Sequence, residues 1–176
     1  MRDRGVLVRI AHGTYIAKPD RIAPDQPWKP PFEEAAMAYA TAAYGDRVPI
    51  LMGVGAARHW HAIPRAIGVT TIAVPDPHRP VDLETGGRIV FKVRRAEPVE
   101  AIPVQAGLGT MRVTTIEQTL IDLIRNPDLG GMPNESEAAA RVLQGRADYE
   151  RLARLVERLP QAAAARVQGW LKSEGA

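Results

Sequence analysis

Two histidines, His59 and His61, come closest in type and spacing to a metal site or an acid–base pair. The run Gly55–Ile63 predicts a short helix, which Pro64 ends. On a helix, positions two apart point about 200° away from each other, so these imidazoles could not bind one metal ion. We therefore expect both histidines to pack against neighbouring residues or to lie on the surface.

The acidic residues do not form a pair suited to acid–base catalysis. Asp76, Asp82 and Glu84 lie in a segment interrupted by prolines, which indicates a solvated loop. The sequence lacks the Gly-x-Ser-x-Gly nucleophile elbow, the phosphate-binding loop that ends in Lys-Ser/Thr, and the Gly-x-Gly-x-x-Gly dinucleotide motif. It contains no cysteine, which excludes disulfides, a cysteine nucleophile and thiolate zinc ligands. We therefore expect no enzyme activity, no metal and no cofactor.

Positive charge is concentrated in two segments that predict β-strands. The net charge is only +3, but residues 1–18 hold four Lys or Arg against one acid, and residues 88–95 hold four and no acid. Strand alternation in the second segment places Arg88, Lys92 and Arg94 on one face. The opposite face holds Ile89, Phe91 and Val93. We expect the apolar face to be buried and the basic face to point to water, as an ordinary solvated surface or as a surface for an anionic partner.

The elements that must position these residues begin with a β-hairpin. Residues 5–10 and 14–17 are rich in β-branched and aromatic residues, a turn at 11–13 separates them, and Pro19 ends the second run. Four prolines then fall within residues 20–31, which indicates a linker. We expect three parts, listed here by residue number: a hairpin at 1–19, a linker at 20–31 and a domain at 32–176.

The larger domain predicts a mixed first half and a helical second half. Its length and its composition, 45% hydrophobic and 24% charged, are those of a globular domain. A helix is predicted at 32–44, and 48–52 is a strand or the lead into the next helix. Further strands are predicted at 69–74, 88–95, 99–105 and 111–113, with helices from 114 onward. The fold class is therefore α+β, with an N-terminal hairpin, a mixed α/β middle with a small sheet, and C-terminal helices.

Capping patterns indicate where the later helices begin. Thr114 with Glu117, and Asn134 with Glu137, have the spacing of a capping box. Asp148 is expected to cap a helix at 149–159, and Pro160 precedes another at 161–172. In the first of these helices, the residues that line one apolar face are Ile116, Leu120, Leu123 and Ile124. Glu117 and Asp122 are therefore expected to be structural and not catalytic.

Two stretches resemble a known family. GVLVRIAHGTYIAKP is similar to the wing of a winged-helix domain, in which a G-x-L-x-R-(I/V)-x-x-G-x-Y pattern closes the module. VTTIEQTLIDLI resembles the V-T-x-x-E-x-T-L-x-D-L segment of the AbiEi family, the antitoxins and transcriptional regulators of type IV (abortive infection) toxin–antitoxin systems. The order of the intervening elements and the ending ARVQGWLK are also similar to that family. The recognition helix of that family precedes the wing, and the sequence before this hairpin is too short to hold it.

The resemblance implies an antitoxin that regulates transcription and counteracts a nucleotidyltransferase-like toxin without requiring a stable complex with it. DNA would be bound mostly through its backbone, because a wing supplies phosphate contacts that position a protein without reading bases. The candidate DNA-binding residues are Arg2, Arg4, Arg9, His12, Lys18, Arg88, Lys92 and Arg94.

Two other functions stay open from the sequence. The chain could be a protein-interaction module that has lost sequence-specific DNA binding. It could also be an enzyme of the kind that carries an endonuclease-like domain after the middle segment, but its tail lacks clustered carboxylates. No run approaches the length of a membrane span, and the N-terminus lacks the apolar stretch of a signal peptide. We therefore expect a cytoplasmic protein with no membrane partner.

Overall fold

The computed structural model describes residues 7–23, 25–94 and 99–174. Arg2 and Arg4 thus lie outside the described residues. The strands are β1 (Leu7–Ala11), β2 (Thr14–Ala17), β3 (Ile50–Met52), β4 (Val69–Val74), β5 (Val81–Asp82), β6 (Arg88–Val93), β7 (Ala101–Ala106) and β8 (Gly109–Thr114). The helices are α1 (Phe32–Tyr44), α2 (Gly53–His59), α3 (Ile116–Arg125), α4 (Pro133–Gln144), α5 (Tyr149–Glu157) and α6 (Gln161–Glu174).

The described strands form two sheets. β1 and β2 make a two-stranded antiparallel hairpin, and the others make a six-stranded mixed sheet in the order β5-β6-β4-β3-β8-β7. In the larger sheet, β4 runs parallel to β6 and β3 runs parallel to β8, while the other pairs are antiparallel. The expected α+β fold, with a hairpin first and helices last, is confirmed.

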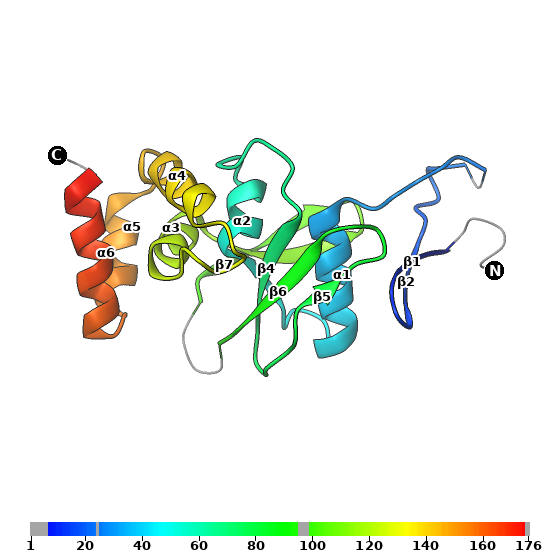
Figure 1. Cartoon of the computed structure of the whole chain (residues 1–176), viewed down its shortest axis with the longest axis horizontal. Helices are drawn as coiled ribbons and strands as arrows, with labels where there is room; N and C mark the ends of the chain where they lie inside the picture. Colours follow the sequence, from blue (N-terminus) through cyan, green and yellow to red (C-terminus); the bar gives the residue numbers. More distant parts are fainter. Residues whose placement is uncertain (1–6, 24, 95–98, 175–176) are drawn as a thin grey trace.

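Helices cover both faces of the six-stranded sheet. On one face the alanines of α1 pack with Leu51, Ile72 and Ile89. On the other face Leu120 of α3 packs in a cluster with Val69. The helices α4, α5 and α6 lie around α3, at the end of the molecule away from the hairpin (Figure 1). β4 is therefore buried along its whole length, which explains its nearly continuous apolar and threonine run.

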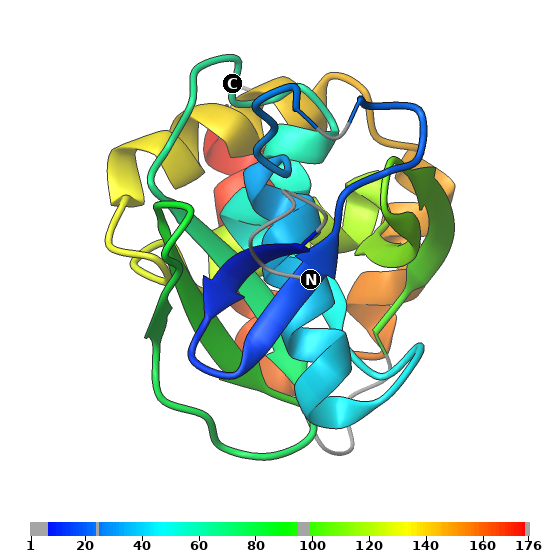
Figure 2. The same cartoon turned by 90° about the vertical axis from the view of Figure 1, so that its right-hand side faces the viewer.

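The hairpin packs against α1 instead of standing free. Ile10 and Ile16 are buried in the same cluster as Ala36 and Met37 of α1. The backbone N–H of Glu84, just after β5, donates a 2.8 Å hydrogen bond to the carbonyl oxygen of Ile10. A two-stranded hairpin is marginal alone in water, and these contacts supply the burial that it lacks. Figure 2 shows the hairpin lying across this end of the molecule, in front of α1.

Most predicted elements form, with shifts at their ends. The helix 32–44 and the strand 69–74 have the predicted bounds, and β3 is a strand. The capping residue of α3 is Thr115, one residue later than predicted, and its hydroxyl accepts from the N–H of Gln118. The box of Asn134 with Glu137 is wrong, because α4 already begins at Pro133. Asp148 caps α5 as predicted, accepting from two backbone N–H groups.

Candidate nucleic-acid interface

The outer face of the hairpin carries Arg9 and Tyr15, which are cross-strand partners. Side chains alternate along each strand, so Arg9 and Tyr15 point away from the face on which Ile10 and Ile16 meet α1. Tyr15 is 41% exposed. Strand alternation in the sequence could have placed Tyr15 beside Arg9, but the charged residues alone did not single it out. The outer face therefore offers a cation and an aromatic ring side by side.

Arg9 is held in place from two sides. Its Nε lies 2.8 Å from a carboxylate oxygen of Glu84, and its side chain is 30% exposed. The same Nε donates to the carbonyl oxygen of Ala11 at 3.4 Å, and a terminal nitrogen lies 3.5 Å from Nδ1 of His12. His12 itself is exposed, at the turn that Gly13 closes with a φ of 71°. The guanidinium is thus oriented at the turn of the hairpin, with part of its charge balanced by Glu84.

Lys18 does not belong to this surface, and the prediction that it binds DNA is wrong. Only 8% of the residue is exposed. Its ammonium donates to the carbonyl oxygens of Ala23 and Gln26. Lys18 therefore ties the proline-rich segment back onto the end of β2, because burial of an ammonium requires hydrogen-bond acceptors close by. The acceptors are backbone carbonyls of a loop, and no sequence pattern identifies them.

The expected basic outer face of β6 is also wrong. The side chain of Arg94 is 4% exposed and forms an ion pair with Asp122 of α3. Lys92 is half-buried and donates a 3.1 Å hydrogen bond to Oδ1 of Asn126. Val93, expected to be buried, is 37% exposed. The alternation of Ile89 against its neighbours holds, but the second face of this strand meets α3 and not water.

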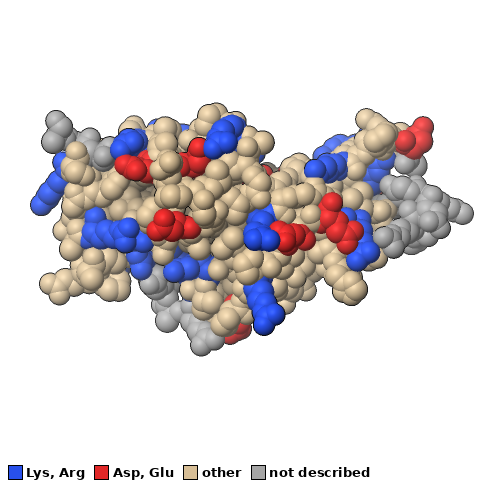
Figure 3. Space-filling model, in the orientation of Figure 1, with Lys and Arg blue, Asp and Glu red and all other residues tan. Residues whose placement is uncertain are grey.

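Arg88 alone of that group lies in solvent, and it has an acidic partner. Its Nε and a terminal nitrogen donate to the two carboxylate oxygens of Asp82 at 2.7 and 2.8 Å. This hydrogen bonding lowers the pKa of Asp82 below its usual value. Arg88, Lys92 and Arg94 are therefore not brought together with the hairpin as one basic surface. Figure 3 shows Lys and Arg interspersed with Asp and Glu over much of this side of the molecule.

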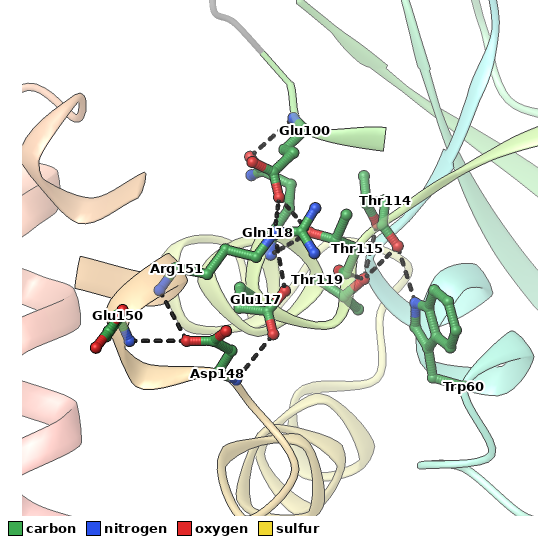
Figure 4. Close-up of polar contacts among 10 residues, drawn as sticks. All are labelled: Trp60, Glu100, Thr114, Thr115, Glu117, Gln118, Thr119, Asp148, Glu150 and Arg151. Atoms are coloured by element: carbon green, nitrogen blue, oxygen red, sulfur yellow. Dashed lines mark hydrogen bonds and ion pairs between the residues drawn. The ribbon is translucent and has the colours of Figure 1, made fainter. Parts of the chain in front are cut away.

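The segment that resembles the AbiEi motif forms a buried polar cluster on α3 (Figure 4). Glu117 is 5% exposed, and a carboxylate oxygen accepts a 2.9 Å hydrogen bond from the backbone N–H of Asp148, the cap of α5. The hydroxyls of Thr114 and Thr119 lie 2.8 Å apart. The indole N–H of Trp60 donates to the carbonyl oxygen of Thr114 at 2.8 Å. These polar side chains therefore join α3 to α2 and α5.

Arg151 of α5 adds charge to the same cluster. It pairs with Glu100, just before β7, and its Nε lies 3.7 Å from a second oxygen of Glu117. Gln118 accepts from the N–H of Glu100 at 3.3 Å and donates to Asp122 at 3.0 Å. Burial raises the pKa of Asp122, while Arg94 and Gln118 act in the opposite direction. The carboxylates of α3 are thus engaged with protein groups.

The two histidines lie near the end of α2. His59 is half-buried with its ring 4.8 Å from that of Trp60, and His61 is exposed with a left-handed φ of 57°. Burial lowers the pKa of His59, the neighbouring His61 lowers it further, and Glu33 opposes both. Among the described residues there is no group of three or more His, Cys, Asp or Glu side chains placed to hold a metal ion.

Two hollows in the described part of the molecule were not foreseen from the sequence. One, of about 610 Å³, lies where α1 faces β8 and is lined by residues that include Met37, Thr41 and Met111. The other, of about 240 Å³, lies at the far end and is lined in part by Arg94, Arg125 and Arg158. Their residues come from segments distant in sequence, so no local pattern could have indicated them.

Comparison with known proteins gives one structural neighbour to report. No protein-family model matches the chain, and no curated protein matches it. The crystal structure of the RV2827C protein from Mycobacterium tuberculosis is similar with a TM-score of 0.54 at 20% sequence identity. The similarity covers 81% of this chain and 54% of that one, so this chain spans about half the length of its neighbour. At this identity the likeness concerns the fold alone. No helix in the described residues is long and apolar enough to cross a membrane.

Proposed function

We propose that this chain is an antitoxin and DNA-binding transcriptional regulator of the AbiEi type, and that its hairpin contacts the DNA backbone. The observation that carries the DNA-binding part is the docking of a basic hairpin on α1, with Arg9 oriented and His12 exposed at the turn. A wing that binds phosphates must be held firmly against its own domain, since a loose hairpin would lose entropy on binding.

The proposed contact residues differ from those that the sequence suggested. Arg9 and His12 remain, and Tyr15 joins them because it is exposed beside Arg9. Arg2 and Arg4 precede the hairpin in sequence and remain candidates on that ground. The buried Lys18, Lys92 and Arg94 no longer belong to the proposed surface. The contacts would be to phosphate and sugar, so we expect weak sequence preference.

The antitoxin part of the proposal depends on the family resemblance of residues 113–123. In that segment the polar side chains of Thr119, Gln118 and Glu117 are buried and hydrogen-bonded to neighbouring elements. Such side chains support the shape of a domain and are not arranged as nucleophile, base and oxyanion donor. We propose a cytoplasmic, non-enzymatic protein that counteracts a nucleotidyltransferase-like toxin without a stable complex.

Salt dependence of DNA binding tests the hairpin surface. The affinity of the chain for duplex DNA, measured by fluorescence anisotropy, should fall steeply with salt. Arg4→Ala and Arg9→Ala should each flatten the slope of log K against log salt by roughly one unit, as expected when one phosphate contact is lost. Arg154→Ala, on exposed α5, is the matched control and should leave the slope unchanged. An affinity that does not depend on salt would contradict the proposal.

A protein-interaction module remains the second candidate, because the hollow beside α1 favours it. Its volume of about 610 Å³ and its mixed lining of methionine, threonine and arginine would accept a side chain of a partner protein. The two functions differ in one measurable way. If the hairpin variants neutralise the toxin fully but have no DNA-binding defect relative to the parent, the interaction module is favoured.

A further inference from the structure

The small pocket at the end of the molecule opposite the hairpin is lined by three arginines. Arg94 comes from the end of β6, Arg125 from the last turn of α3, and Arg158 from the C-terminal end of α5. Its volume is about 240 Å³. A water molecule takes up about 30 Å³ in the liquid, so this pocket has room for a phosphate group with a few attached atoms. Three segments far apart in sequence thus converge on one site.

The charges around the pocket leave it positive. Asp122 lies behind it, with Arg94 paired to its carboxylate and Arg125 close enough to act on its charge. Two guanidiniums therefore face one carboxylate. Glu100, the one acid among the lining residues, pairs with Arg151 from outside the pocket. Arg158 adds a further positive charge at the exposed rim.

The polar groups of the pocket are oriented before any ligand arrives. Arg94 is almost fully buried and held by Asp122, so its planar guanidinium has little freedom to lose. Gln118 is fixed between the N–H of Glu100 and Oδ1 of Asp122. Preorganised arginines bind phosphate tightly, because their N–H groups match two phosphate oxygens at once and pay little ordering entropy.

The remaining walls of the pocket are apolar. Leu155, Leu159 and Pro160 line it where α5 turns into α6, and Val99 closes it from the start of the β7 segment. Figure 3 shows Lys and Arg gathered over the lower part of this end of the molecule. A small ligand that carries a phosphate and a compact organic group would meet both kinds of wall.

We propose that this pocket binds a small phosphorylated molecule through Arg94, Arg125 and Arg158. The site is remote from the hairpin and does not depend on DNA binding (Figure 1). It would make the chain a sensor for a phosphate-bearing metabolite, read at the junction of β6, α3 and α5.

The test is thermal unfolding of the full chain with inorganic phosphate, and then with adenosine monophosphate, each against sodium chloride of equal ionic strength. At about ten times its Kd, the bound ligand should raise the Tm by roughly 3–5 °C. Arg158→Gln should weaken the affinity by at least about tenfold, measured by calorimetry, because a charged hydrogen bond is lost. Arg158 is exposed, so this variant should fold with the Tm of the parent when no phosphate is present.

The control is Arg154→Gln, one turn earlier on α5. Its side chain is 59% exposed, lies 3.9 Å from Glu150 and does not line the pocket, so phosphate binding should be unchanged. Arg9→Ala should also bind phosphate normally, which separates this proposal from the DNA-binding one. A phosphate effect no larger than that of chloride, an equal loss in Arg154→Gln, or binding only of 5′-phosphorylated oligonucleotides would each overturn the inference.

Discussion

At the scale of single residues, the ion pair of Arg94 and Asp122 is the most exposed to mutation, because both side chains are nearly excluded from water. Arg94→Leu would leave Asp122 buried without its main counter-charge. We expect a loss of about 3–5 kcal/mol in the free energy of unfolding, measured with urea.

The double variant Arg94→Leu with Asp122→Leu removes both charges and should recover much of that loss, since a buried ion pair replaced by apolar residues is often neutral in stability. A single Arg94→Leu variant as stable as the parent would show that water reaches Asp122.

His59 gives the molecule a pH dependence at the acid side of neutrality. Its pKa in the folded chain is lowered, so between the ordinary histidine pKa of 6.5 and the folded value the unfolded chain binds more protons. Stability should therefore fall as the pH drops below about 6.5. His59→Gln should reduce this fall in Tm between pH 7.5 and pH 5, measured by circular dichroism. An unchanged pH profile in the variant would rule out His59 as the cause.

At the scale of elements, α3 is the helix on which the C-terminal half depends. Its apolar side includes Leu120, which is fully buried in the cluster shared with α2, α4, α5 and α6. Leu120→Ala should lower the free energy of unfolding by about 2–5 kcal/mol through the lost burial and the cavity. Ala138→Ser, on the exposed side of α4, is the control and should change it little. A Leu120→Ala variant within 1 kcal/mol of the parent would mean that the site collapses to fill the space.

Local patterns predicted those elements whose signals are themselves local. Proline at the start of α1 and glycine after it mark its ends, and the β-branched run of β4 is unmistakable. The cap of α3 was misplaced because Thr114 and Thr115 are adjacent and both can accept a hydrogen bond; only the register of the helix decides between them. β5 was missed because two residues carry no periodicity.

The candidate site was predicted less well, for the same reason. Alternation in β6 identified which residues share a face, but not that α3, more than twenty residues later, covers that face. Lys18 was assigned to solvent because the carbonyl oxygens that bury it belong to an irregular loop. Arg9 was identified correctly as a hairpin cation, since the hairpin is local and its partner Glu84 leaves it partly exposed.

At the scale of the whole molecule, the hairpin and the arginine pocket lie at opposite ends, with the six-stranded sheet between them (Figure 1). Docking of the hairpin through Ile10 and Ile16 should protect its backbone N–H groups from hydrogen exchange. Ile16→Ala should increase exchange in residues 7–17 while leaving that of β4 unchanged. Equal protection in parent and variant would mean that this apolar contact does not hold the hairpin.

The central claim is that the hairpin is the surface that meets DNA. The most direct measurement is a titration of the full chain with duplex DNA at low salt, followed through the backbone amide signals by NMR. We predict that the shifted signals concentrate in residues 7–17 and around Glu84, and that the shifts disappear at high salt. Shifts centred on α5 and α6 or on the hollow beside α1, with an unperturbed hairpin, would contradict the account.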